Sequence, residues 1–202
     1  MTIKEYILFP LKLFFNKLFR PVYKVRVAKI ISDLCPDNSY ILDYGCDDGS
    51  TAKRVMKFNP SLKIVGVDIQ SNRPAKIPRK TYDGKKIPYP SNTFDIVMSL
   101  DVLHHTKNIP EHIKEMKRVS KKYLIIKDHM RYGFFSKLLI SFTDYISNVS
   151  YGIKCAFNFP LKKEWYQMFK EQNLDLIKNP KKLNFGFGIT ERYNLIFKLQ
   201  KK

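Results

Sequence analysis

Paired cysteines and long apolar runs are the features that the sequence most clearly lacks. Its three cysteines, Cys35, Cys46 and Cys155, lie far apart and form no C-x-x-C pair. This spacing argues against a disulfide framework and a zinc site, so we expect no metal and a reducing, cytoplasmic location. No apolar run reaches the ~20 residues that a membrane span needs. Lys12 and Lys17 interrupt the apolar amino end, which argues against a signal peptide.

Acidic residues are scarce as well. The chain has 37 Lys and Arg against 18 Asp and Glu, which gives a formal net charge of +19. A surface this basic favours an anionic partner, such as nucleic acid or a membrane surface. Several acids lie at the ends of segments that read as strands or in the turns beside them, which suggests that they serve a site, although acids favour turns in general. These acids are Asp43, Asp68, Asp83, Asp95 and Asp128.

The segment Ile41 to Ser50 combines a strand end, a glycine turn and a helix start. Asp43 follows a buried apolar pair, Gly45 and Gly49 bracket the turn, and Ser50 is expected to cap the next helix. Glycines let the backbone approach a ligand, and the first free N–H groups of the helix point toward it. The segment therefore predicts a small-ligand site, although glycine turns also close many ordinary strand–helix units.

A second short apolar segment, Lys63 to Asp68, ends in an acid about 20 residues after the turn, where doubly wound folds hold ribose hydroxyls. The dehydrogenase fingerprint G-x-G-x-x-G does not fit. It would require glycine at Asp47 and glycine or alanine at Ser50.

Five motifs, in this order, resemble those of class I S-adenosylmethionine-dependent methyltransferases. Ile41 to Ser50 resembles the D-x-G-C-G-x-G loop, and Val65 to Asp68 is similar to the second motif. Thr81 to Val97 looks like the family's next block, in which an acidic turn is followed by the letters LPF and then by FD and a hydrophobic residue.

The segment Ser99 to His105 resembles the one after the fourth strand in the small-molecule branch, which contains the quinone-pathway methyltransferases. A helix around Glu115 to Val119 and a strand from Tyr123 to His129 continue the match.

The resemblance implies a Rossmann-like, doubly wound α/β fold. Its seven-stranded sheet would be mostly parallel, with an antiparallel last strand. It also implies S-adenosyl-L-methionine as cofactor. Asp43 and Gly45 would lie by its methionine part, and the backbone near Ser99 would contact the ammonium group. Asp68 would lie by the ribose and Asp83 by the adenine amino group. The full expected binding set is Asp43, Tyr44, Gly45, Cys46, Gly49, Asp68, Ile69, Asp83, Gly84 and Ser99.

Two features depart from the family pattern. Asp47 replaces the middle glycine of the loop, and its carboxylate would either pair with the cofactor ammonium or crowd the site. Ile69 to Lys80 carries Pro74 and Pro78, so the helix usual there must be very short or absent.

Residues 1–34 precede the first strand, and residues 35–202 form the expected methyltransferase domain. Apolar residues recur at helical spacing from Ile3 to Val22 among many cations, and Pro10 and Pro21 break the segment into helical pieces. Two interpretations remain open: a helix packed on the domain, or a basic amphipathic segment that covers the substrate mouth or lies on an anionic membrane. The second would place the protein at the inner membrane surface.

The remaining elements follow from periodicity and from breaking residues. Helices are expected over Ser50–Phe58, from Asn108 to about Val119, and over Phe134–Val149 and Pro160–Gln172. Strands are expected over Phe94–Ser99, Tyr123–Lys127, Leu174–Ile177 and Tyr193–Leu199, with a turn at Asn184–Gly188.

Histidines at two strand ends are the candidate catalytic residues. His104 and His105 follow the fourth strand, and Asp128 and His129 end the fifth, so all are expected to face one cleft. An oxygen nucleophile benefits from a general base, and histidine is the usual one near neutral pH. The alternative is that these histidines only cap a helix or bond a carbonyl. Asp144 and Asn148, a turn apart, would hold substrate polar groups or stabilise their own helix.

We therefore expect methyl transfer to a small-molecule acceptor that is amphipathic or anionic, with the oligomeric state left open. RNA methylation is the alternative suggested by the charge, although Ser99 to Val102 lacks the D/N-P-P-aromatic motif associated with base methylation. A third interpretation is a cofactor-binding domain that has lost turnover through Asp47.

Overall fold

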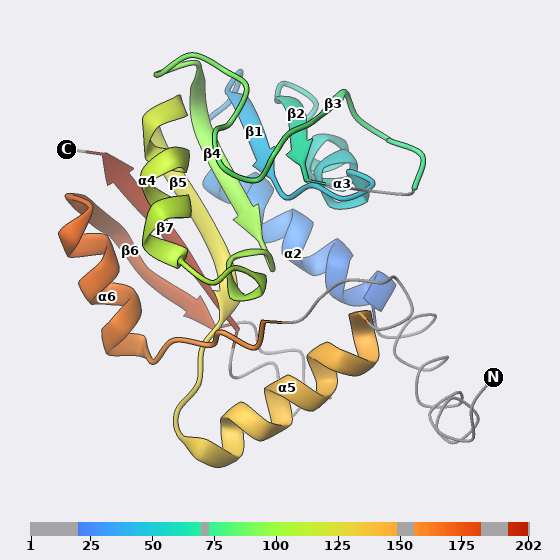
Figure 1. Ribbon diagram of the computed structural model, residues 1–202. Helices are drawn as coiled ribbons and strands as arrows, with labels where there is room; N and C mark the ends of the chain where they lie inside the picture. The colour runs from blue at the N-terminus through green and yellow to red at the C-terminus, as the bar shows by residue number, and fades with distance from the viewer. Residues whose placement is uncertain (1–19, 70–72, 149–155, 183–193, 202) are drawn as a thin grey trace.

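The computed structural model describes residues 20–69, 73–148, 156–182 and 194–201, and these form a three-layer α/β domain (Figure 1). A seven-stranded sheet has the order β3-β2-β1-β4-β5-β7-β6. The strands are β1 (Tyr40–Tyr44), β2 (Lys63–Asp68), β3 (Arg79–Thr81), β4 (Phe94–Leu100), β5 (Ser120–His129), β6 (Leu174–Lys182) and β7 (Asn194–Lys201). The helices are α2 (Arg20–Leu34), α3 (Ser50–Phe58), the short 3-10 helix η2 (Leu103–His105), α4 (Ile109–Val119), α5 (Phe134–Asn148) and α6 (Lys162–Glu171).

The sheet is parallel except for β7, the last strand of the chain. β7 pairs antiparallel with both β5 and β6, whereas the pairs among β3, β2, β1, β4 and β5 are parallel. The doubly wound order and the antiparallel last strand confirm the predicted fold class. Parallel strands also bring the carboxyl ends of β1, β2, β4 and β5 to one edge of the sheet, which is where α/β folds hold their ligands.

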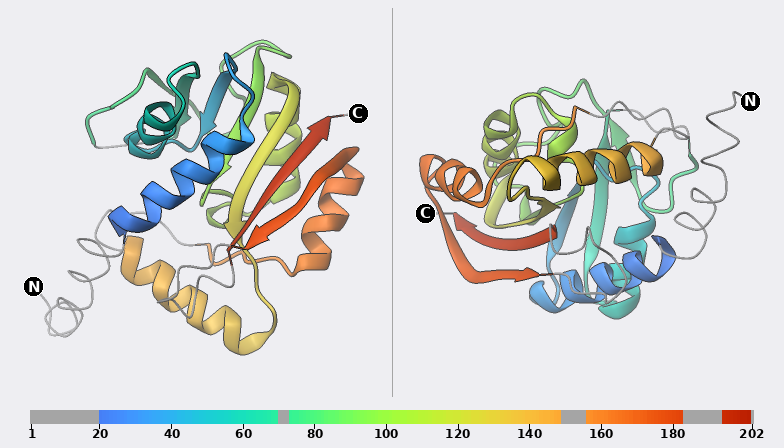
Figure 2. Two further views of the ribbon diagram at one scale, coloured as in Figure 1. Left: turned by 180° about the vertical axis from the view of Figure 1, so that it is seen from behind. Right: turned by 90° about the horizontal axis from the view of Figure 1, so that it is seen from below.

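Alternate residues of the central strands serve two separate cores. Leu42 and Val97 pack with α4 and α6, while Ile41 and Ile96 face α2 and α3. Figure 2 shows these helix pairs on opposite faces of the sheet. Burial on both faces explains why these strands read as continuous apolar runs.

The element boundaries agree closely with the sequence-based predictions for α3, α4 and α5, and β5, β6 and α6 differ by a few residues at their ends. The expected cap of α3 was wrong. Gly49 is the N-cap, and Ser50 is already the first helical residue. The first helical N–H is satisfied by the residue before the N-cap, since Asp48 Oδ1 accepts the Ser50 N–H at 2.9 Å.

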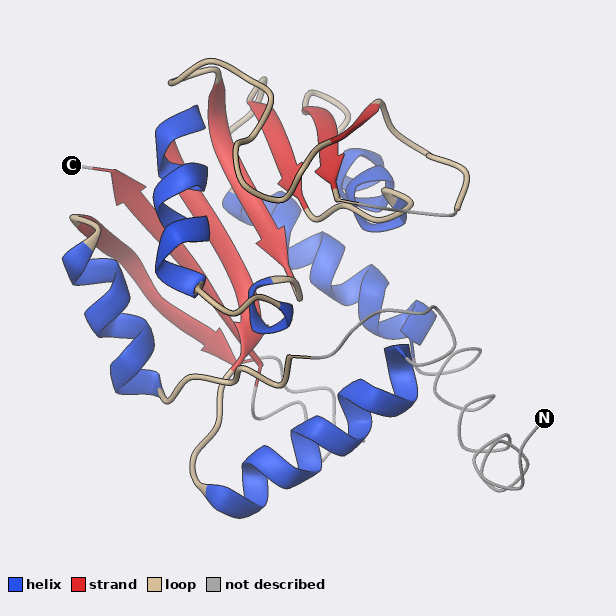
Figure 3. Ribbon diagram, in the orientation of Figure 1, coloured by secondary structure: helices blue, strands red, loops and turns tan. Residues whose placement is uncertain are grey.

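The described part of 69–78 contains no helix, as the two prolines predicted. Figure 3 shows it as loop. The predicted turn at 184–188 lies outside the described residues.

Helix α2 packs on the sheet through Val27, Ala28 and Ile31, which are at most 3% exposed. Residues 20–34 therefore form a helix packed on the domain, which is the first of the two interpretations of this segment. Residues 1–19 lie outside the described part, and the division of the chain at residue 34 stays a prediction. Among the described helices, none is both long enough and apolar enough to cross a membrane.

The close packing of β2 against the glycine loop gives a test of the fold. A Cβ at Gly66 would overlap the Cys46 side chain. We expect Gly66→Ala to lower the free energy of unfolding by about 1–3 kcal/mol, as overpacking does. The Gly66→Ala/Cys46→Ala double variant should recover part of that loss.

Urea unfolding followed by circular dichroism would measure both effects. Gly133→Ala is the matched control, because a Cβ there would meet nothing within 4 Å, and it should stay within about 0.5 kcal/mol. Equal stability of Gly66→Ala and the control would contradict the packing described.

Candidate functional site

The loop between β1 and α3 is held in a fixed turn against the sheet edge. Gly45 and Gly49 have φ values of 72° and 71°, which only glycine adopts without strain. The Gly45 and Cys46 N–H groups donate to the Val67 carbonyl at 2.9 and 3.2 Å. A Cβ at Gly45 would lie 2.6 Å from both Val102 methyl carbons. The first glycine is therefore required by close approach to the segment after β4.

Asp47 takes the glycine-like conformation of the position that it occupies, with φ 51°. Its N–H donates to Asp68 Oδ2 at 2.7 Å, which ties the loop to the end of β2. Its carboxylate forms an ion pair with Arg73, whose Nε donates to Oδ1 at 3.0 Å. Asp47 therefore keeps the loop geometry, with its charge balanced by a neighbouring guanidinium.

Asp43 is a buried carboxylate at the carboxyl end of β1, 3% exposed. Burial, together with the nearby Asp68 charge, raises its pKa to about 7. Such a group gains most from a ligand that brings a positive charge or hydrogen-bond donors. Ser99 supports the same interpretation: it is fully buried in β4 and its Oγ has no partner in the described part of the chain.

At the end of β2, Ile69 and Gly84 form an apolar ledge. Ile69 is 62% exposed, and a Cβ at Gly84 would lie 3.1 Å from Ile69 Cγ2. Asp83 is exposed, and its Oδ1 accepts the Lys85 and Lys86 N–H groups at 2.9 and 3.2 Å. The Asp83 carboxylate thus stabilises its own turn.

The side chains of two expected binding residues turn away from the loop. The Tyr44 hydroxyl lies 2.6 Å from His112 Nδ1 of α4, and Cys46 packs in the core on the α2 and α3 side. Tyr44 and Cys46 therefore present only their backbone to a ligand in the loop.

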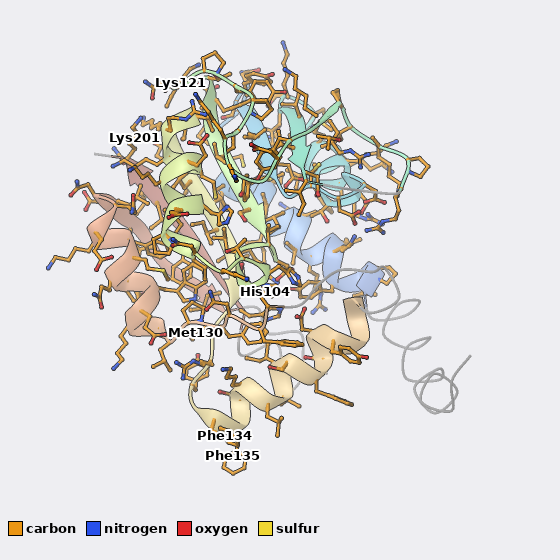
Figure 4. The ribbon with its side chains drawn as sticks, viewed as in Figure 1. His104, Lys121, Met130, Phe134, Phe135 and Lys201 are labelled. Carbon is orange, nitrogen blue, oxygen red and sulfur yellow. The ribbon has the colours of Figure 1, made fainter. Side chains whose placement is uncertain are left out.

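The structure brings all four predicted catalytic residues together at the ends of β4 and β5, near the His104 label of Figure 4. His104 Nδ1 lies 2.6 Å from Asp128 Oδ1. The rings of His105 and His129 lie 4.0 and 4.8 Å from the His104 ring, measured between centroids. Asp128 Oδ2 also accepts the Leu103 N–H at 2.9 Å, which holds η2 to the end of β5.

Two further acids belong to this cluster. Asp101 was absent from the predicted site, and Asp144 had been predicted only to hold substrate polar groups or to stabilise its own helix. Asp144 of α5 places Oδ1 3.3 Å from His104 Nε2 and 3.9 Å from His105 Nε2. Asp101 pairs with the fully buried Lys127, and its Oδ1 lies 3.7 Å from His129 Nε2. Asp144 is the single acid in an apolar helix, and this composition was the available signal for it.

The three histidines differ in charge because their surroundings differ. Burial would lower the His104 pKa, but the flanking Asp128 and Asp144 carboxylates raise it well above its ordinary value, so His104 is protonated near neutral pH. Burial and the His104 charge lower the pKa of His105, and the same causes lower that of His129 to about 4. His105 and His129 are therefore neutral and able to accept a proton.

His105 has a side-chain exposure similar to that of His129, the other neutral base of the cluster. Its side chain is 19% exposed and that of His129 is 17% exposed. The Nδ1 atoms of both have no hydrogen-bond partner among the described residues.

Three side chains of this cluster have atoms that could bind a metal ion. His104, His105 and Asp144 each offer one such atom, and these atoms lie within 4.8 Å of one another. The sequence had predicted no metal site. The 3.3 Å separation between His104 Nε2 and Asp144 Oδ1 is also accounted for by a hydrogen bond.

The glycine loop and the histidine cluster adjoin through Val102, whose side chain approaches Gly45 and which directly precedes η2. A ligand in the loop would therefore be next to the histidines. The acidic ligand site at the glycine loop therefore adjoins the neutral bases of the histidine cluster.

Comparison with known proteins identifies the family of this arrangement. The family model described as "Methyltransferase domain" matches residues 19–179. Two solved structures share the fold: the YcgJ protein of Bacillus subtilis has a TM-score of 0.62 at 15% identity, covering 89% of this chain and 98% of that one. A SAM-dependent methyltransferase of Aquifex aeolicus has a TM-score of 0.59 at 15% identity, covering 86% and 88%.

Two relatives are similar over part of their length. The tRNA (carboxymethyluridine(34)-5-O)-methyltransferase of Schizosaccharomyces pombe is 32% identical over 100 residues, covering 46% of this chain and 40% of that protein. The malonyl-[acyl-carrier protein] O-methyltransferase of Legionella pneumophila is 29% identical over 89 residues, covering 39% and 31%. The chain thus spans less than half the length of both relatives.

The raised pKa of Asp43 predicts a pH-dependent cost of folding. The folded state keeps the proton to higher pH than the unfolded state, so this carboxyl lowers stability as pH rises from about 4 to about 7. Each tenfold difference in proton affinity between the two states corresponds to about 1.4 kcal/mol. We expect Asp43→Asn to unfold at higher temperature than the parent at pH 7.5, with the difference vanishing near pH 4.

Calorimetric melting of both proteins across this pH range, without cofactor, would measure the difference. Asp37→Asn, on the exposed loop after α2, is the control and should melt as the parent does throughout. An Asp43→Asn variant that melts lower than the parent at pH 7.5 would contradict the assigned charge state.

Proposed function

We propose, from the premise that the chain belongs to the class I S-adenosyl-L-methionine-dependent methyltransferase family, that it methylates an oxygen atom of a small-molecule acceptor. When bound, S-adenosyl-L-methionine supplies an activated methyl group on a positively charged sulfur. The observation that carries the oxygen assignment is the neutral, partly exposed His105 beside the glycine loop.

The described residues fit this cofactor. The buried Asp43 and Ser99 offer oxygens for a ligand with positive charge and hydrogen-bond donors. Asp68 lies at the end of β2, where doubly wound folds bind ribose hydroxyls, and the Ile69–Gly84 ledge suits a flat apolar ring. We assign the carboxylate of Asp83 to stabilising the turn that contains Gly84.

His105 is proposed as the general base for the acceptor hydroxyl or carboxyl group. Its side chain is partly exposed, and burial together with the His104 charge lowers its pKa, so it is unprotonated at neutral pH. His129 is a second neutral base within the same cluster, positioned by its backbone bond to Asp128 at 2.7 Å. Proton removal matters for an oxygen acceptor, because a hydroxyl group is a poor nucleophile until its proton is accepted.

His104, Asp128 and Asp144 are proposed to position the base. The imidazolium of His104 is fixed between two carboxylates and cannot easily lose its proton, so it serves as an electrostatic anchor. Its charge keeps the neighbouring His105 neutral. The pair Asp101 and Lys127 supports the other side, next to His129.

The names of both relatives support an oxygen acceptor, since each is an O-methyltransferase. One of them acts on tRNA, and the net charge of +19 also suits RNA. We favour a small molecule because the described part contains no separate RNA-binding module. Loss of turnover through Asp47 is not favoured, since Arg73 holds that side chain and the loop keeps its shape.

Cofactor binding is tested at Asp68. Removing a charged hydrogen-bond partner costs about 1.5–3 kcal/mol, so Asp68→Ala should weaken S-adenosyl-L-methionine binding at least about tenfold. Asp83→Ala is the comparison, because the carboxylate is assigned to its own turn, and it should lose much less. Titration calorimetry would measure both, and equal affinity of Asp68→Ala and parent would reject the assignment.

The catalytic proposal is tested by a variant and by product chemistry. Cell extract incubated with methyl-labelled cofactor should yield a labelled small molecule, whereas label that is removed by ribonuclease would support the RNA alternative. His105→Gln should lower turnover about 10²–10⁴-fold with unchanged cofactor affinity. Parent activity should fall as pH drops through the lowered His105 pKa. A variant with full turnover and the same pH profile would overturn this role.

A further inference from the structure

Helix α5 carries its polar side chains inward and its aromatic side chains outward. Ser136, Ile140 and Asp144 form its buried side and are at most 8% exposed. The α5 apolar face, as we define it here, comprises Phe134 (76% exposed), Phe135 (84%), Leu138 (62%), Phe142 (50%) and Tyr145 (47%). An amphipathic helix of a globular domain normally has the opposite arrangement.

Local hydrogen bonds secure the start of the helix, and a contact with the site fixes its orientation near the end. At the start, Ser136 Oγ accepts the Tyr132 and Gly133 N–H groups at 2.8 and 2.9 Å. Toward the end, Asp144 reaches His104 of the site. Turning α5 to bury its aromatic residues would break this contact and leave Asp144 away from the histidines. The outward apolar face therefore follows from the inward polar contacts.

Helix α5 lies on the outside of the molecule, beyond the carboxyl ends of the strands (Figure 1). In Figure 4 the labelled Phe134 and Phe135 point away from the body of the protein. A contiguous exposed apolar face of this kind marks an interaction site.

Cations adjoin this face, and they indicate the nature of its partner. Lys137 is exposed on α5 itself. A cleft of about 380 Å³ beside it is lined by Lys107, Arg131 and Lys137, with Glu164 as its only acid, 3.6 Å from Arg131. Neither lysine has a carboxylate within ion-pair distance among the described residues. Asp144 is the only acid of α5 and it is buried.

We propose that the α5 apolar face inserts into the surface of an anionic lipid bilayer, with Lys107, Arg131 and Lys137 at the headgroups. Aromatic and aliphatic side chains enter the boundary between headgroups and acyl chains, and each nearby cation adds attraction to anionic lipid. A second copy of the chain is the less suitable occupant, since it would bring together two chains of charge +19. The contact would hold the site at the membrane surface.

The test uses the full chain and sedimentation with vesicles of phosphatidylglycerol and phosphatidylcholine in equal parts, or of phosphatidylcholine alone. We expect binding to the anionic vesicles and much weaker binding to the neutral ones. Phe135→Ser/Leu138→Ser should reduce the anionic partition coefficient at least about tenfold, since two exposed apolar groups no longer enter the bilayer. Lys107→Gln/Lys137→Gln should weaken binding at low salt and have less effect at high salt.

Phe58→Ser is the matched control, because it removes an exposed phenylalanine (44% exposed) from α3 on another side of the molecule. It should bind vesicles as the parent does. All variants are first compared by melting temperature. A Phe135→Trp variant adds a direct readout: its emission should shift to shorter wavelength with anionic vesicles, while the buried Trp165 contributes a constant signal.

Several outcomes would overturn the proposal. Parent-like vesicle binding by Phe135→Ser/Leu138→Ser would show that another part, such as the basic residues 1–19, carries the attachment. Unchanged Phe135→Trp emission with bound vesicles would have the same meaning. Absence of vesicle binding, together with self-association in sedimentation velocity that the α5 variant abolishes, would assign the face to a second copy.

Discussion

The carboxylate of Asp128 makes the contacts on which the histidine cluster depends. It is 1% exposed at the end of β5, accepts the Leu103 and His129 N–H groups, and pairs with His104. Through these bonds a single buried charge sets the position of η2, the backbone after β5 and the ring of His104. Desolvating a carboxylate is costly unless its oxygens are satisfied, and here three donors satisfy it. Burial alone would raise its pKa, yet the His104 charge and these hydrogen bonds lower it strongly.

The two halves of the site have opposite electrostatic characters, and this difference suits their tasks. Asp43 has a raised pKa because burial is reinforced by Asp68, so this half favours a cationic ligand. Around the histidines, Asp128 and Asp144 both flank His104, and Asp101 pairs with Lys127. Burial and the His104 charge keep His105 and His129 neutral. Separation of a binding half from a proton-accepting half suits the proposed methyl transfer to an oxygen, because the donor is positive and the acceptor must lose a proton.

Local sequence patterns predicted most of the fold because the central strands are buried on both faces and their helices begin and end at strong signals. Lys63–Asp68 and Ser50–Phe58 were predicted with the bounds that the structure gives. The meeting of His104, His105, Asp128 and His129 could be predicted because parallel strands end at one edge of the sheet. The Asp144 contact could not be predicted, since nothing local shows that α5 turns its polar side inward. The cap of α3 was mistaken because Ser50 is a good capping residue, and only backbone geometry shows that Gly49 is the N-cap.

Asp144 gives α5 two properties that are normally independent. Its contact with His104 is 3.3 Å long and lies in the buried cluster, so the helix must present this side to the site. A helix has only one opposite side, and on α5 that side consists of Phe134, Phe135, Leu138 and their neighbours. The charge arrangement that keeps His105 neutral thus also determines which surface faces outward. Displacing α5 would remove the Asp144 carboxylate, whose charge raises the pKa of both His104 and His105. Contact at the α5 apolar face and the pKa of His105 are therefore linked through the Asp144 side chain.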